Sequence, residues 1–359
     1  MAASSTITLQ DSGVARRAAA RKAEKPHINL ALQGGGAHGA FTWGVLDRLF
    51  ELDLFEIEGI VGTSAGAMNA AVVACGIAEG GAEGARAKLR EFWSAIAEAA
   101  KQGPMQPSLI DRLMSPGNMD FSPMWLATDA LSKVFSPYQL NPLNLNPLRD
   151  TLEGIVDFDT VCKTKHVKLF LCATDCMNGK IHVFKGDEIS VDAVLASACL
   201  PFLFQAVEID GRFYWDGGYM GNPPLYPLIY GTETSDILIC QINPIVIDEL
   251  PTTAQAIMDR INTLSFNSSL MREMRIIEFV GRLIDQGHLD PEHYKQLHIH
   301  VIEAEAEMRK LSVSSKLNAH WDFLMHLFEI GRCKADAWVE AHLDKVGKAS
   351  STDIAAKYL

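Results

Sequence analysis

The sequence lacks a hydrophobic run of about eighteen residues, the length that a helix needs to cross a bilayer. Residues 1 to about 25 are rich in alanine and serine with basic residues between them, and they lack the apolar core of a secretory signal. We therefore expect a flexible basic tail over 1–25 and a cytoplasmic protein whose contact with membranes, if it occurs, is peripheral.

Basic residues are also scarce. The chain has 32 Lys and Arg against 44 Asp and Glu, a formal net charge of −12, which opposes broad binding to nucleic acid. The 7 cysteines are odd in number and contain no C-x-x-C pair, so they favour free thiols in a reducing compartment over a disulfide framework. We expect no nucleic-acid partner.

No recognised zinc spacing is present. Four histidines gather near the C-terminus, and two of them form an H-x-H on an expected strand. No cysteine lies near them, so we expect a surface cluster and no metal site. The four are His288, His293, His298 and His300.

What the sequence does have is a G-x-S-x-G pattern over 62–66, placed between a short apolar run and an alanine-rich helical segment. This arrangement is typical of a nucleophile elbow, in which Gly62 and Gly66 let the neighbouring chain pass close to an exposed Ser64. The alternative is a tight turn in which Ser64 only caps the helix that follows.

A glycine-rich run over 33–39 follows an expected strand at 27–32 and precedes a helical pattern. Its glycines fit G-x-G-x-x-G, but a dinucleotide fold also needs an acidic residue at the end of the second strand, where this chain has Gly62-Thr63-Ser64. Consecutive glycines at a helix N-terminus also expose N–H groups that stabilise an oxyanion. We favour the oxyanion role and expect no cofactor.

A third pattern, Asp216-Gly217-Gly218, ends an expected strand that begins with a hairpin around Asp210-Gly211. Alone, such a D-G-G is typical of a turn. Beside an elbow and a glycine loop, it predicts a catalytic carboxylate.

These three motifs, in this order, resemble those of the patatin-like phospholipase family, and the similarity runs from about residue 28 to 243. The resemblance implies an acyl hydrolase with a Ser–Asp dyad, in which Ser64 is the nucleophile and Asp216 its base. It also implies an oxyanion hole, which we assign to Gly34, Gly35, Gly36 and Ala65.

The dyad is physically reasonable because burial raises the pKa of a carboxyl group and makes it a stronger base. His38 is the rival base, since it lies within the glycine loop. Its place there favours ordering of the turn or contact with substrate, so we list His38 as a candidate substrate contact.

The alternation of strands and helices predicts an α/β fold, with a mostly parallel central sheet between helices in three layers. We expect a catalytic domain over 26–245 and a mainly helical C-terminal extension over 246–359 that packs on it. Within the extension we expect a long helix at 253–286 and a strand at 297–303. Seven prolines with methionines and aromatics at 103–150 predict a cap or, equally, a proline-rich crossing segment.

The predicted function is serine acyl hydrolysis of lipid carboxylic esters through an acyl-enzyme, of the phospholipase A or lysophospholipase type. The expected substrates are phospholipids, lysophospholipids or other acyl esters. Two alternatives stay open: a lipid acyltransferase that uses the same dyad, and a catalytically silent protein that binds a nucleotide or a partner. A homo-oligomer is also left open.

Overall fold

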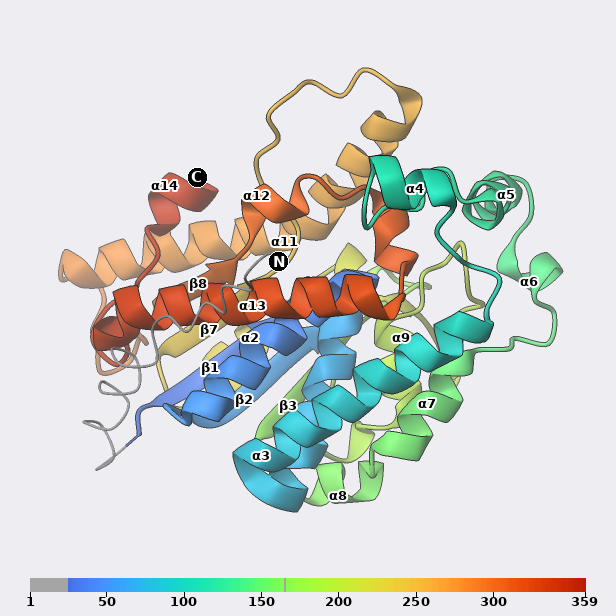
Figure 1. Ribbon diagram of the computed structural model, residues 1–359. Helices are drawn as coiled ribbons and strands as arrows, with labels where there is room; N and C mark the ends of the chain where they lie inside the picture. Colours follow the sequence, from blue (N-terminus) through green and yellow to red (C-terminus); the bar gives the residue numbers. More distant parts are fainter. Residues whose placement is uncertain (1–24, 165) are drawn as a thin grey trace, which may run out of the picture.

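The computed structural model describes residues 25–164 and 166–359 (Figure 1). The predicted tail therefore lies outside the described residues, except for Lys25, which forms an ion pair of 2.6 Å with Asp53. The predicted division into domains stays a prediction.

One eight-stranded sheet forms the centre of the molecule, in the order β5-β6-β3-β2-β1-β7-β8 with β4 also paired to β3. The strands from β3 to β8 in this order run parallel, whereas β4 and β6 run antiparallel to β3. The predicted α/β class with a mostly parallel sheet is confirmed. The bounds are β1 His27–Leu32, β2 Glu56–Thr63, β3 Lys168–Asp175, β4 Lys180–Lys185, β5 Val207–Ile209, β6 Arg212–Asp216, β7 Asp236–Gln241 and β8 His298–Glu303.

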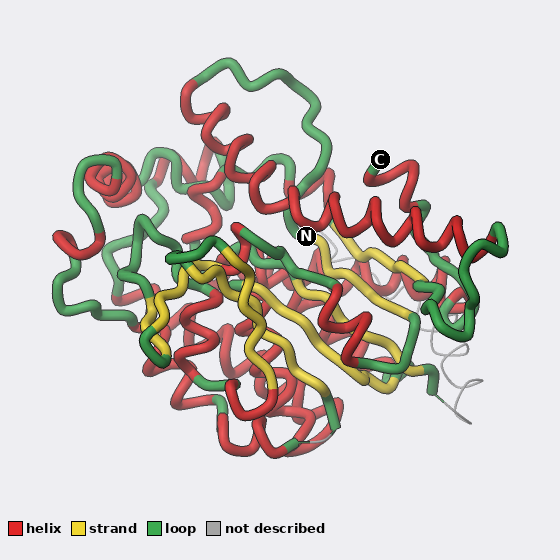
Figure 2. The backbone as a smooth tube through the Cα atoms, turned by 180° about the vertical axis from the view of Figure 1, so that it is seen from behind, coloured by secondary structure: helices red, strands yellow, loops and turns green. Residues whose placement is uncertain are grey.

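Helices cover both faces of this sheet, because alternate strand residues point to opposite sides. Leu30 and Ile60 join the core under one helical layer, and Ala31 and Val61 join the core under the other. The first layer contains α2 (Gly39–Leu52), α3 (Ala65–Gln102), α8 (Phe158–Lys163), α9 (Val191–Ser197) and α13 (Trp321–His342). The second, nearer the viewer in Figure 2, contains α10 (Tyr226–Gly231), α11 (Ala254–Asp285) and α14 (Ile354–Tyr358).

The proline-rich segment after α3 forms short helices, and proline lies at the N-terminus of three of them. Pro123, Pro137 and Pro147 occupy first-turn positions, where the missing N–H costs nothing. The helices are α4 (Leu109–Met114), α5 (Pro123–Ser132), α6 (Pro137–Leu140) and α7 (Pro147–Ile155). Throughout residues 25–164 and 166–359, none of the helices has the length and apolar character that a bilayer crossing requires.

The predicted surface cluster of histidines is wrong for His300, which is fully buried. Its Nε2 lies 2.9 Å from Asp236 Oδ1, and His298 Nδ1 lies 3.4 Å from Asp236 Oδ2. The cause is the parallel pairing of β7 with β8, which places both histidines beside this carboxylate, and the His300 ring also meets Trp338 of α13 edge-on. In the described part of the chain, no group of three or more potential ligands could hold a metal ion.

Candidate active site

Two strands meet end to end on one edge of β3, and this junction brings Ser64 and Asp216 together. β4 occupies one edge of β3 from Phe170 to Asp175, so β2 and β6 share the other. There, Thr63 pairs with Cys172, and Asp216 pairs with the next residue, Ala173. Because β2 and β6 approach from opposite directions, the carboxyl ends of both strands face each other at this point.

Ser64 lies in a strained backbone conformation between β2 and α3, with φ of 56° and ψ of −124°. Its N–H donates to Ser197 Oγ at 3.0 Å, while its carbonyl accepts from the first turn of α3. A Cβ on Gly62 would lie 2.4 Å from the Gly66 carbonyl oxygen, so the turn cannot accept a larger residue there. This turn is compatible with the predicted nucleophile elbow, and the role of Ser64 as a nucleophile stays a prediction.

The Asp216 side chain is fully buried. Its Oδ1 accepts from the Gly218 N–H at 2.7 Å, while Oδ2 has no hydrogen-bond partner of ordinary geometry among the described residues. Burial raises the pKa of Asp216 to about 6, against the opposing effects of the Gly218 N–H, the Ser64 hydroxyl and the charge of Lys316. A carboxylate with this pKa is a competent proton acceptor near neutral pH.

The glycine loop lies against the elbow. The Gly34 N–H donates to Asn222 Oδ1 at 2.6 Å, so it is already engaged and is not free to join the oxyanion hole in this conformation. In contrast, the N–H groups of Gly35, Gly36 and Ala65 donate no hydrogen bond within the described chain. A Cβ on Gly34 would lie 2.6 Å from Ser64 Cβ, so glycine is required for this approach.

His38 points toward the C-terminal part of the chain. Its Nε2 lies 2.7 Å from Ser315 Oγ, and its ring meets Phe323 edge-on at 6.3 Å between centroids. Burial, aided by the charge of Lys316, lowers the pKa of His38 to about 3. Such an imidazole is a weaker base than Asp216, and its contact with substrate stays a prediction.

Sequence analysis missed several residues that complete the site. Asn222 and Asn243 hold the Gly34 backbone, with Asn243 Nδ2 donating to the Gly34 carbonyl at 2.9 Å. Lys316 lies in the turn η4 (Val313–Leu317), and its Nζ donates to Asn243 Oδ1 at 3.2 Å. None of the three lies in a recognisable motif, so only the fold brings them to the site.

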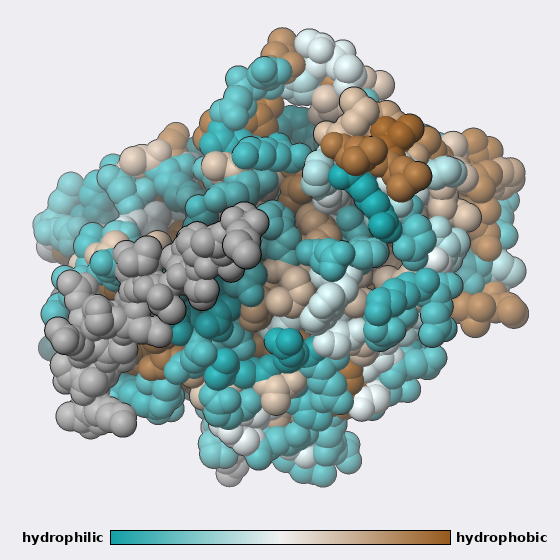
Figure 3. All heavy atoms as spheres, viewed as in Figure 1, coloured by the Kyte–Doolittle hydropathy of each residue, from teal (hydrophilic) through white to brown (hydrophobic). Residues whose placement is uncertain are grey.

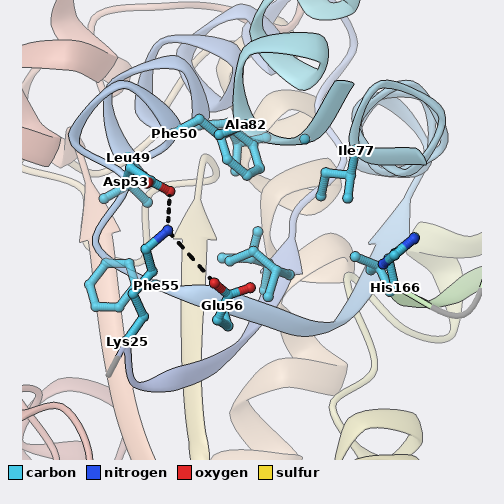
Figure 4. Close-up of a pocket in the computed structure, with 14 residues that line it drawn as sticks. Lys25, Leu49, Phe50, Asp53, Phe55, Glu56, Ile77, Ala82 and His166 are labelled. Atoms are coloured by element: carbon cyan, nitrogen blue, oxygen red, sulfur yellow. Dashed lines mark hydrogen bonds and ion pairs between the residues drawn. The ribbon is translucent and has the colours of Figure 1, made fainter. Parts of the chain in front are cut away.

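Two surface cavities lie away from this site. One, about 450 Å³, is at the amino ends of β1 and β2, where Lys25 lies between Asp53 and Glu56 (Figure 4). A second lies between α7 and α8 beside Lys88. Neither is lined by Ser64 or Asp216.

Comparison with known sequences gave a consistent match. A family model described as patatin-like phospholipase matches residues 30–229, more than half of the chain. Uncharacterized NTE family proteins of Mycobacterium bovis and Mycobacterium tuberculosis are 27% identical over 208 residues, which cover 58% of this chain and 47% of theirs. A cGAMP-activated phospholipase of Escherichia coli is 26% identical over 229 residues, covering 56% of this chain and 55% of the relative. The chain thus spans about half the length of these relatives.

Solved structures gave more distant matches. VipD from Legionella pneumophila has a TM-score of 0.46 and 14% identity, over 93% of this chain and 73% of that protein. ExoU in its complex with SpcU from Pseudomonas aeruginosa has a TM-score of 0.34 and 15% identity, over 91% of this chain and 53% of that one.

Proposed function

Because the chain belongs to the patatin-like phospholipase family, we propose that it is a serine hydrolase that cleaves carboxylic ester bonds of lipids through an acyl-enzyme. The observation that carries this proposal is the junction of β2 and β6 on β3. It supports the proposal because a buried carboxylate, with one oxygen unpartnered in the described structure, ends the strand that faces the turn carrying Ser64.

The proposed reaction has two steps. In the first, Asp216 Oδ2 takes the Ser64 hydroxyl proton as Oγ attacks the ester carbonyl, and the proton then passes to the departing alcohol. In the second, Asp216 takes a proton from the water that attacks the acyl-enzyme, and it returns this proton to Ser64 Oγ as the acyl–oxygen bond breaks and the fatty acid leaves.

Both steps form a negatively charged tetrahedral intermediate. The N–H groups of Gly35, Gly36 and Ala65 are the candidate donors to its oxygen, since they are unengaged within the described structure and lie in the glycine loop and at the start of α3, beside Ser64. Gly34 keeps a different role in this proposal, because its own N–H and carbonyl hold the loop against Asn222 and Asn243.

Lipid substrates are supported by exposed apolar side chains next to the site. Leu109 and Leu113 of α4 are 78% and 83% exposed, and this part of the molecule is coloured as hydrophobic in Figure 3. The segment after α4 is tied to η4 by a 2.8 Å hydrogen bond from the Met119 N–H to Ser314 Oγ, and η4 lies against the glycine loop. We propose that this apolar surface meets acyl chains and the membrane that presents them.

The decisive experiment is labelling with a fluorophosphonate, which reacts only with an activated serine, together with assays on a lipid ester. We expect label at Ser64, and we expect Ser64→Ala to lose the label and about 10³-fold or more of the activity. Ser268→Ala is the control, because that hydroxyl bonds only within α11.

Failure to label the wild-type protein would contradict the hydrolase and favour a silent binding protein. Labelling with acyl transfer to an added alcohol in preference to water would favour the acyltransferase instead.

A further inference from the structure

The turn η4 lies outside the residues that the family model matches, yet it forms one wall of the site. A Cβ on Gly36 would lie 2.3 Å from the Lys316 carbonyl oxygen, and Ser315 bonds His38. The C-terminal part of the chain therefore touches the glycine loop directly.

The Lys316 ammonium is held by neutral groups. Nζ donates to Asn262 Oδ1 at 3.0 Å and to Asn243 Oδ1 at 3.2 Å, and it lies 5.1 Å from the centroid of the Phe266 ring. It forms no ion pair within the described part of the chain. Burial lowers the pKa of Lys316 to about 8, so the group is still largely charged at neutral pH.

Two carboxylates interact electrostatically with this charge. One is Asp216 at the end of β6: the Phe266 ring beside the ammonium packs on Gly218, where an added Cβ would lie 2.4 Å from the ring, and the Gly218 N–H donates to Asp216 Oδ1. The other is Asp259 of α11, which accepts from Gln255 at 2.9 Å. The remaining titratable group that faces the ammonium is His38, which burial keeps neutral at neutral pH. Of these groups, Asp216 is the one with an unpartnered buried oxygen.

We propose that Lys316 is a positioning residue of the active site, whose ammonium keeps Asp216 in the carboxylate form and so sets the lower pH limit of catalysis. The inference rests on the proposed function. A buried carboxylate needs a nearby positive charge in order to stay ionised. In this proposal that charge comes from Lys316, which lies outside the residues that the family model matches. Through Asn243, the same ammonium is also linked to the backbone of Gly34.

The test is the pH dependence of kcat/KM for Lys316→Met on a short, uncharged soluble ester. Loss of the positive charge raises the Asp216 pKa, so the acid limb should move upward by up to about one pH unit. At pH values on this limb, kcat/KM should be lower than in wild type by up to about tenfold, and at pH 8.5 it should stay within a few-fold of wild type. Lys310→Met is the matched control, because Lys310 is an exposed lysine on the same connection and should leave the limb unmoved.

Asn262→Asp gives a second, isosteric test if Lys316→Met does not fold. The new carboxylate would lie 3.0 Å from Nζ and cancel its field at Asp216, so the limb should again move upward. Lys316→Arg keeps the charge and should keep the limb near its wild-type position.

Three outcomes would overturn the inference. These are an unmoved acid limb in both variants, a loss that is equal at every pH, and a loss confined to phosphate-bearing lipids, which would make Lys316 a headgroup contact. If wild-type protein neither hydrolyses esters nor labels at Ser64, the proposed function itself fails.

Discussion

At the scale of single residues, the environment of Asp216 links activity to stability. The folded-state pKa of about 6 lies above the ordinary value of 3.8, so the folded protein binds this proton more tightly than the unfolded chain does. Ionised Asp216 therefore destabilises the fold above pH 6 by about 3 kcal/mol, and this cost disappears as the pH falls through 6 toward 4.

Asp216→Asn should abolish activity nearly as completely as Ser64→Ala, because an amide cannot take the serine proton. The same variant should be more stable than wild type at pH 8, by up to about 3 kcal/mol, and equally stable at pH 3.5. Urea unfolding at the two pH values measures this difference. His38→Gln should cost less activity, and an equal loss would instead favour a histidine base.

At the scale of the elements, α2 and α13 cross at a point where two glycines remove all side-chain bulk. A Cβ on Gly44 would lie 1.9 Å from the Phe328 carbonyl oxygen, and one on Gly331 would lie 2.2 Å from the Phe41 carbonyl oxygen. Both contacts are with backbone, which cannot rotate away. Since α2 begins directly after the glycine loop, this crossing also fixes the loop.

Gly44→Ala and Gly331→Ala should each lower the free energy of unfolding by about 2 kcal/mol or more, because the helices must separate to admit a methyl group. Gly154→Ala on α7 is the control. Among the described residues, no atom outside its own helix and chain neighbours lies within 4 Å of its added Cβ, so it should raise stability by up to about 1 kcal/mol through helix propensity. Equal effects at all three positions would contradict the proposed close contact.

The sequence allowed prediction of those elements whose signals are local. The strand–turn–helix around Ser64 and the strand that ends at Asp216 each carry their own glycines and apolar runs, and both elements are present. Their meeting on β3 could not be predicted from spacing, because it depends on pairing between distant strands. The place of Lys316 in the site and the burial of His300 could not be predicted for the same reason, since an isolated polar residue in the sequence shows nothing of its tertiary neighbours.

At the scale of the whole molecule, the apolar surface of α4 predicts a difference between soluble and membrane-bound substrates. Leu109→Ser with Leu113→Ser should weaken binding to phosphatidylcholine vesicles about tenfold or more, because each leucine loses burial in the lipid. Hydrolysis of a short soluble ester should not change. Vesicle sedimentation and a parallel ester assay measure the two effects.

Tyr230→Ser serves as the control for this prediction. Tyr230 is 85% exposed but lies just before β7, at the end of the sheet away from Ser64. Its substitution should leave vesicle binding unchanged, whereas an equal loss would mean that binding does not depend on the α4 surface.

On the proposed function, the junction on β3 also determines when, during synthesis, the chain can first hydrolyse an ester. Ser64 and its glycine loop leave the ribosome early, but they have no proton acceptor until β6 has emerged and joined β3. On our proposal for Lys316, full activity near neutral pH waits longer still, until η4 has docked. We therefore expect a nascent chain that ends before β6 to show no esterase activity.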